Sequence, residues 1–203
     1  MDKVIEQLTG KAINRLVSGG YIAREKEDVY LYGAKVAIQS IVTIFAMLIV
    51  GALFGKFYEN ICFMIVFKLL RNFSGGLHSS KFSICFLISV ASNVVILIAL
   101  KFLDSNPNSF LALIPEVISL LIVVILAPIA NVNKPISKKE RKIFKLIVTL
   151  FCVALIVVSV ALIVNGNRIV FAISLAMTLN GFLLVIEKIK VRKVLLKDNK
   201  TIK

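Results

Sequence analysis

The chain has 203 residues, of which 59% are hydrophobic, and its 25 Lys and Arg against 11 Asp and Glu give a net charge of +14. A soluble domain of this size does not carry so much apolar surface, and long apolar runs indicate transmembrane helices. The basic residues flank these runs and do not alternate with aromatic residues on one face, which argues against nucleic acid as a partner. The composition therefore predicts an all-α polytopic membrane protein, with the lipid bilayer as a partner.

The N-terminal region, residues 1–35, carries apolar residues at helical spacing with charged residues between them. This pattern predicts an amphipathic helix that ends at Gly19-Gly20. The apolar side can lie on the membrane or pack on the cytoplasmic face of the protein itself, and the sequence favours neither.

A membrane domain at residues 36–186 follows, with a polar and basic tail at 187–203. Six apolar segments predict six transmembrane helices: 36–55, 57–70, 82–100, 110–130, 146–165 and 169–186. The second segment is the weakest, because Glu59 and Lys68 interrupt it. An alternative with two short or half-crossing helices in place of the first two spans leaves the later topology unchanged.

The positions of Lys and Arg predict the orientation. In chain order, the N-terminal region, the five connections and the tail hold six, one, three, one, six, one and seven of them. This alternation puts 22 of the 25 on the side of both termini and three on the other. Because cytoplasmic loops are enriched in Lys and Arg, we expect both termini in the cytoplasm.

Residues 71–85 carry the candidate chemistry. His78, the single histidine of the chain, precedes Cys85 by seven residues on the cytoplasmic side, and imidazole can take the proton of a thiol nucleophile. Gly75-Gly76 allows the chain to bend between Arg71 and His78. On one straight helix the two groups would be about 10.5 Å apart, too far for proton transfer, so the helix must start after His78 or the loop must fold back.

The alternative without catalysis is a histidine in a juxtamembrane loop and a cysteine that packs as a small apolar group. Asn72 and Glu59 are candidates for a third catalytic group by proximity in sequence alone. The three cysteines, Cys62, Cys85 and Cys152, are odd in number and widely spaced, which argues against a disulfide framework and against a metal site. The sequence indicates no cofactor.

Two segments carry a resemblance to a known family. The run from Arg71 to Cys85, Arg-x3-Gly-Gly-x-His-x6-Cys, resembles the signature of the accessory gene regulator B (AgrB) family of membrane endopeptidases. The segment 127–136, which reads Ala-Pro-x-Ala-Asn-x-Asn-Lys-Pro-Ile before a basic cluster, is similar to the family's loop after the fourth span. Chain length, the six spans and the basic tail also fit.

The resemblance implies a function. Such proteins are cysteine endopeptidases that cleave the C-terminal part of an AgrD-type quorum-sensing propeptide, with Cys85 as nucleophile and His78 as base. Arg71, Gly75 and Gly76 would bind substrate or support the site. An internal Cys or Ser of the peptide then attacks the acyl-enzyme thioester and closes a thiolactone or lactone ring, which gives the autoinducing peptide.

The resemblance further implies a homodimer in the bacterial cytoplasmic membrane, with the active site on the cytoplasmic side. One departure limits the comparison, because Ile136, Ser137 and Glu140 interrupt the basic loop. The main alternative function is a membrane transporter or exporter of a small peptide without proteolytic activity. It would favour ionisable residues deep within the spans, whereas those present, Glu59, Lys68 and Glu116, lie near the ends of the predicted segments.

Overall fold

The computed structural model describes residues 2–74, 82–104, 108–129 and 137–201. Helices and short connections make up these residues, and no strand occurs among them. The predicted all-α class is confirmed. The chain divides into two compact units, residues 1–55 with 78–95 and residues 56–77 with 96–203, and α4 (Phe82–Asp104) contributes residues to both.

Unit 1 contains α1 (Asp2–Ser18), the short helix η1 (Arg24–Lys26), α2 (Glu27–Leu53) and the first part of α4. α1 is the predicted amphipathic helix and ends where expected, because Gly20 has a φ of +74° and allows the chain to turn. α1 packs against α2, and an ion pair of 2.5 Å joins Glu6 to Lys35. Thr9 and Ile13 are buried on α1, which favours packing on the protein's own helices.

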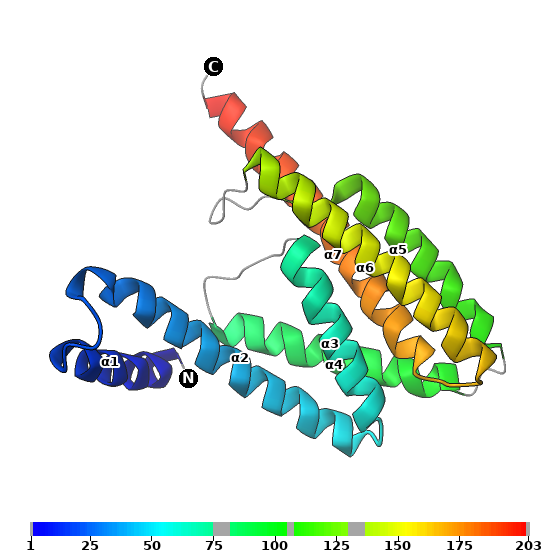
Figure 1. Ribbon diagram of the computed structural model, residues 1–203, viewed down its shortest axis with the longest axis horizontal. Coiled ribbons are helices and arrows are strands. Elements are labelled where there is room, and N and C mark those ends of the chain that lie inside the picture. The colour runs from blue at the N-terminus through cyan, green and yellow to red at the C-terminus, as the bar shows by residue number, and fades with distance from the viewer. Residues whose placement is uncertain (1, 75–81, 105–107, 130–136, 202–203) are drawn as a thin grey trace. The chain divides into compact units, whose positions relative to one another are not determined.

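Unit 2 is built around α7 (Val170–Thr201), which packs against α3 (Phe57–Ser74), α5 (Leu113–Leu126) and α6 (Lys138–Val164) (Figure 1). The start of α7 is almost wholly buried, from Val170 through Met177 with the exception of Leu175. A mainly apolar segment that is buried on nearly all sides is typical of the central helix of a membrane bundle.

Two helix boundaries differ from the predicted spans for local reasons. α5 ends at Leu126, before the predicted end of the fourth span, because Pro128 disfavours helical angles in the preceding Ala127, which is extended. α6 begins at Lys138, before the predicted start at 146, because Ser137 and Glu140 form a reciprocal capping box with bonds of 3.2 and 2.8 Å.

Among the described residues, five helices are long and apolar enough to cross a membrane: 24–53, 83–104, 109–126, 139–164 and 170–190. The chain is therefore a polytopic membrane protein. The second predicted span is a helix, α3, but Glu59, Lys68 and Arg71 keep it out of this group. The count of six spans stays a prediction, as does its alternative with a half-crossing helix.

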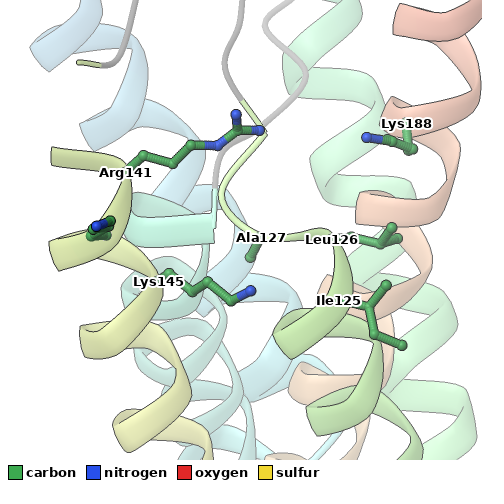
Figure 2. A pocket seen from close by; sticks show the side chains of 7 residues that line it. Ile125, Leu126, Ala127, Arg141, Lys145 and Lys188 are labelled. Carbon is green, nitrogen blue, oxygen red and sulfur yellow. The ribbon is translucent and has the colours of Figure 1, made fainter. Parts of the chain in front are cut away.

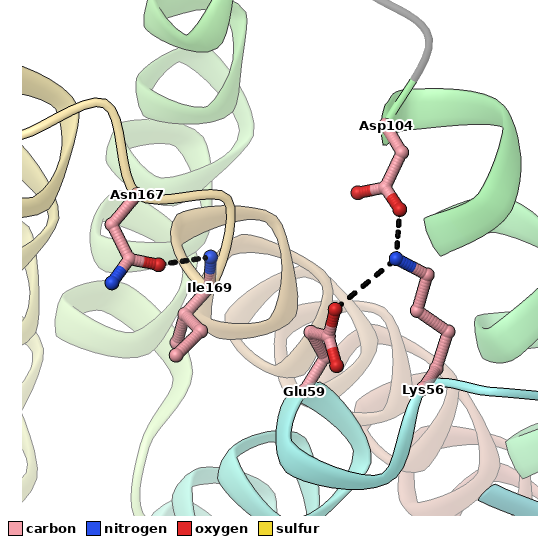
Figure 3. Close-up of polar contacts among 5 residues, drawn as sticks. All are labelled: Lys56, Glu59, Asp104, Asn167 and Ile169. Carbon is pink, nitrogen blue, oxygen red and sulfur yellow. Dashed lines mark hydrogen bonds and ion pairs between the residues drawn. The ribbon is translucent and has the colours of Figure 1, made fainter.

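The start of α3 is tied to the end of α4 by an ion pair between Lys56 and Asp104, and Lys56 also pairs with Glu59 at 3.1 Å (Figure 3). The contact with Asp104 keeps the pKa of Lys56 above its ordinary value, because the carboxylate accepts a hydrogen bond from the ammonium group. The start of α3 and the end of α4 therefore meet at one end of unit 2.

Candidate functional site

Cys85 is the fourth residue of α4, and its side chain is exposed. The other two thiols differ from it, because Cys62 on α3 is half-buried and Cys152 on α6 is fully buried. All three are free thiols. Cys85 is thus the most exposed of the three thiols.

The centre of the predicted segment, residues 75–81, lies outside the described residues. It includes Gly75, Gly76 and His78. Residues 130–136 of the second segment also lie outside the described residues. The described part of α4 begins at Phe82 and contains Cys85 but not His78. The pairing of the two side chains stays a prediction.

Arg71 lies half-buried in the last turn of α3, which ends at Ser74. Arg71 belongs to unit 2 and Cys85 to unit 1. Of the two residues suggested as a third catalytic group, Asn72 is exposed on α3. Glu59 is at the opposite end of α3 and is paired with Lys56, which gives it a structural partner of its own.

Ser74 anchors the segment that leads to His78. It is fully buried, its hydroxyl donates a hydrogen bond of 3.0 Å to Oδ1 of Asn180 on α7, and its carbonyl oxygen accepts one of 3.1 Å from the N–H of Ile129. Ile129 follows Ala127-Pro128, the start of the second resemblance segment. The two segments, separated by some fifty residues in the chain, are therefore joined by a direct backbone bond.

Asn180 was missed by sequence reasoning. It is fully buried on α7, and its amide nitrogen has no hydrogen-bond partner within the described part of the chain. An asparagine inside an apolar run was the available signal, because a buried amide in a membrane helix needs a partner on another helix. The sequence alone did not reveal that this partner is Ser74.

Glu116 is a second buried polar residue in unit 2. Its carboxyl accepts a hydrogen bond of 2.8 Å from the hydroxyl of Ser159 and so links α5 to α6. It is fully buried in a helix that is a candidate span. This bond gives Glu116 a structural role between helices.

A model of the accessory gene regulator B family matches residues 9–184, and this range includes every site residue discussed above. The chain belongs to the AgrB family. Two proteins of Clostridium perfringens that carry the name AgrB-like are similar to it. The one from strain SM101 is 28% identical over 144 residues, and the one from strain 13 is 27% identical over the same length. Each alignment covers 68% of this chain and 67% of the relative.

No solved structure matches this AgrB family chain. Membership of the family links the chain in general terms to the processing of AgrD-type peptides and to a membrane location. The reaction itself and the residues that perform it are matters of proposal.

Proposed function

We propose that this chain is a membrane-embedded cysteine endopeptidase, which cleaves the C-terminal part of an AgrD-type propeptide and promotes closure of the thiolactone or lactone ring. The observation that carries the proposal is the exposure of Cys85, in contrast to the half-buried Cys62 and the buried Cys152. A reactive thiol must be accessible, and a structural one is usually buried. The family match over residues 9–184 supports the same assignment.

In the first half of the reaction, His78 takes the proton of Cys85 and the thiolate attacks the scissile carbonyl carbon. The peptide C–N bond breaks, and His78 gives the proton to the leaving amine. The N-terminal part of the propeptide is then joined to Cys85 as a thioester. The first turn of α4 supports this step, because the positive end of a helix stabilises a nearby thiolate.

In the second half, a thiol or hydroxyl of the bound peptide gives its proton to His78 and attacks the thioester carbonyl. The bond to the sulfur of Cys85 breaks, the sulfur takes the proton back, and the ring is closed. Exchange between a thioester and a thiolactone costs little free energy, but water competes as a nucleophile. A thiol at the end of a membrane helix is partly shielded from water, which favours ring closure over hydrolysis.

Arg71 and the Gly75-Gly76 pair are proposed as support for this site, and Ser74 with Asn180 as positioning residues that fix where the segment leaves unit 2. Ser74 and Asn180 are both fully buried, so their hydrogen bond fixes the position from which the segment after Ser74 begins. The proposal includes a homodimer in the bacterial cytoplasmic membrane, with both termini and the active site on the cytoplasmic side, in line with the alternation of Lys and Arg.

The test uses the full chain in proteoliposomes with an AgrD-type propeptide. We expect Cys85→Ala and His78→Ala to abolish cleavage, while Cys62→Ala, a matched thiol control, keeps it. Mass spectrometry of the parent after a short incubation should detect a thioester adduct on Cys85 that hydroxylamine removes. Cleavage by Cys85→Ala at the rate of the parent would reject the proposed nucleophile.

The competing function, peptide export without proteolysis, predicts a different result in the same vesicles. Intact propeptide would cross the membrane in the parent and in Cys85→Ala alike. Transport of uncleaved peptide, with no adduct on Cys85, would favour the exporter.

A further inference from the structure

A cavity of about 440 Å³ lies in unit 2 where α5 ends, α6 begins and α7 leaves its apolar run. Figure 2 shows Arg141 and Lys145 extending from α6, and Lys188 extending from α7, toward the end of α5. The lining comprises four cations and three apolar residues: Arg141, Lys142, Lys145, Lys188, Ile125, Leu126 and Ala127.

The four cations are not paired with a carboxylate in the part of the chain that the structure describes. None of the ion pairs among the described residues includes Arg141, Lys142, Lys145 or Lys188. Four like charges around one cavity repel one another, and an anion held between them would remove that repulsion. Guanidinium and ammonium groups together are suited to phosphate, which accepts hydrogen bonds from both.

The apolar wall of the cavity points to the kind of anion. Ile125 lines the cavity and is 75% exposed, so the apolar surface of the wall continues to the outside of unit 2. The cavity also lies where three candidate spans end or begin, at Leu126, Lys139 and Lys190. This is the level at which lipid head groups meet acyl chains, and an anion bound there would carry an apolar tail beside Ile125.

We propose that this cavity is a binding site for the phosphate head group of an anionic phospholipid, with an acyl chain along the exposed apolar surface at Ile125. The head group is held by cations from two helices, which also links α6 to α7 at their polar ends. Because four cations are available, a lipid with two phosphates binds more tightly than a lipid with one. All residues that line the cavity belong to unit 2, whereas Cys85 belongs to unit 1.

The test is native mass spectrometry of the full chain in a neutral detergent, titrated with short-chain phosphatidylglycerol. Short-chain phosphatidylcholine, glycerol phosphate and an acidic peptide serve as parallel probes. The variant is Lys142→Gln with Lys188→Gln. Its matched control, Lys139→Gln with Lys190→Gln, removes the same charge from the same two helices at residues that do not line the cavity.

We expect saturable binding of phosphatidylglycerol to the parent. A cation near a lipid surface changes affinity about fivefold, so the cavity pair of substitutions should weaken binding roughly 30-fold and the control pair much less. Glycerol phosphate should bind far more weakly than the lipid, because it lacks the apolar tail. Equal binding of glycerol phosphate would mean a free phosphate site and would overturn the lipid assignment.

Three further results would count against the proposal. Equal losses of phosphatidylglycerol affinity in the two pairs of substitutions would indicate that general surface charge attracts the lipid, and not the cavity. Binding of phosphatidylcholine as tight as that of phosphatidylglycerol would remove the role of net anionic charge. Tighter binding of the acidic peptide, lost in the cavity variant alone, would assign the cavity to a peptide.

Discussion

The bond between Ser74 and Asn180 gives the sharpest test of how the candidate site is held. Ser74→Ala removes the hydroxyl that donates to Oδ1 of Asn180 at 3.0 Å. It leaves the backbone bond from Ile129 to Ser74 in place, because that bond uses the carbonyl oxygen. The substitution therefore removes one of the two anchors and keeps the other.

The expected cost follows from burial. Both side chains are fully buried, so water cannot replace the lost partner of Asn180. A buried acceptor left without a donor costs about 1–3 kcal/mol in water-soluble proteins. Hydrogen bonds between membrane helices average about 0.6 kcal/mol and reach about 1.7. We expect a coupling of about 1 kcal/mol between the two residues, and a fall in melting temperature of about 2–4 °C for Ser74→Ala.

A double-mutant cycle of Ser74→Ala and Asn180→Ala measures this coupling by thermal unfolding in nanodiscs. Ser174→Ala is the matched control, because the hydroxyl of Ser174 on α7 is likewise buried and likewise donates to another element, at 2.8 Å to the carbonyl oxygen of Ala112. Both serine variants should lose similar stability. Only Ser74→Ala should lower the kcat of propeptide cleavage, by roughly tenfold or more, because a small shift of a catalytic group has a large effect on rate.

Two results would refute this reasoning. A coupling energy near zero would mean that the bond does not stabilise the fold. Equal losses of kcat in Ser74→Ala and Ser174→Ala would mean that activity follows general stability, and the positioning role would be withdrawn.

The remaining predictions concern packing, charge and capping. Gly181→Leu should separate α5 from α7 and destabilise the chain by about 1–3 kcal/mol in chemical unfolding, because even a Cβ at 181 would lie 3.3 Å from the hydroxyl of Ser119. At pH values below about 10.5, Asp104→Asn should have a lower melting temperature than the parent. This gap in melting temperature should close at higher pH, because the ion pair that raises the pKa of Lys56 stabilises the fold only while Lys56 is charged. An unchanged gap at all pH values would exclude this ion pair as its source. Ser137→Ala should cost about 0.5–2 kcal/mol by loss of the cap of α6, with cleavage retained.

Sequence patterns predicted the fold well where a single physical effect dominates. Long apolar runs predicted the helices α2, α4, α6 and α7, and Gly19-Gly20 correctly marked the end of α1. The boundaries were less accurate where local chemistry decides them, as at Ser137, whose capping box extends α6 into a charged segment. Hydropathy does not register a cap, because the residues that form it are polar.

For the candidate site, the sequence offers only the covalent chemistry, and that chemistry stays a prediction. A thiol and an imidazole in one short segment can be read from the chain, and Cys85 is the exposed thiol. The contacts of Ser74 could not be read, because hydrogen bonds between distant helices leave no periodic pattern. The same applies to the basic cavity, because its cations on α6 lie more than forty residues before Lys188 on α7.

The bond from Ile129 to Ser74 gives the Ala127-Pro128 segment a physical role. Pro128 lacks a backbone N–H and Ala127 is extended, so the helix cannot continue past Leu126. Ile129 is then free of helical bonding, and its N–H donates to Ser74 instead. Had α5 continued, that N–H would have been used within the helix, and Ser74 would have lost its second anchor. If this reasoning holds, Pro128→Ala should impair propeptide cleavage more than it impairs stability, and that result would connect the two segments through one backbone bond.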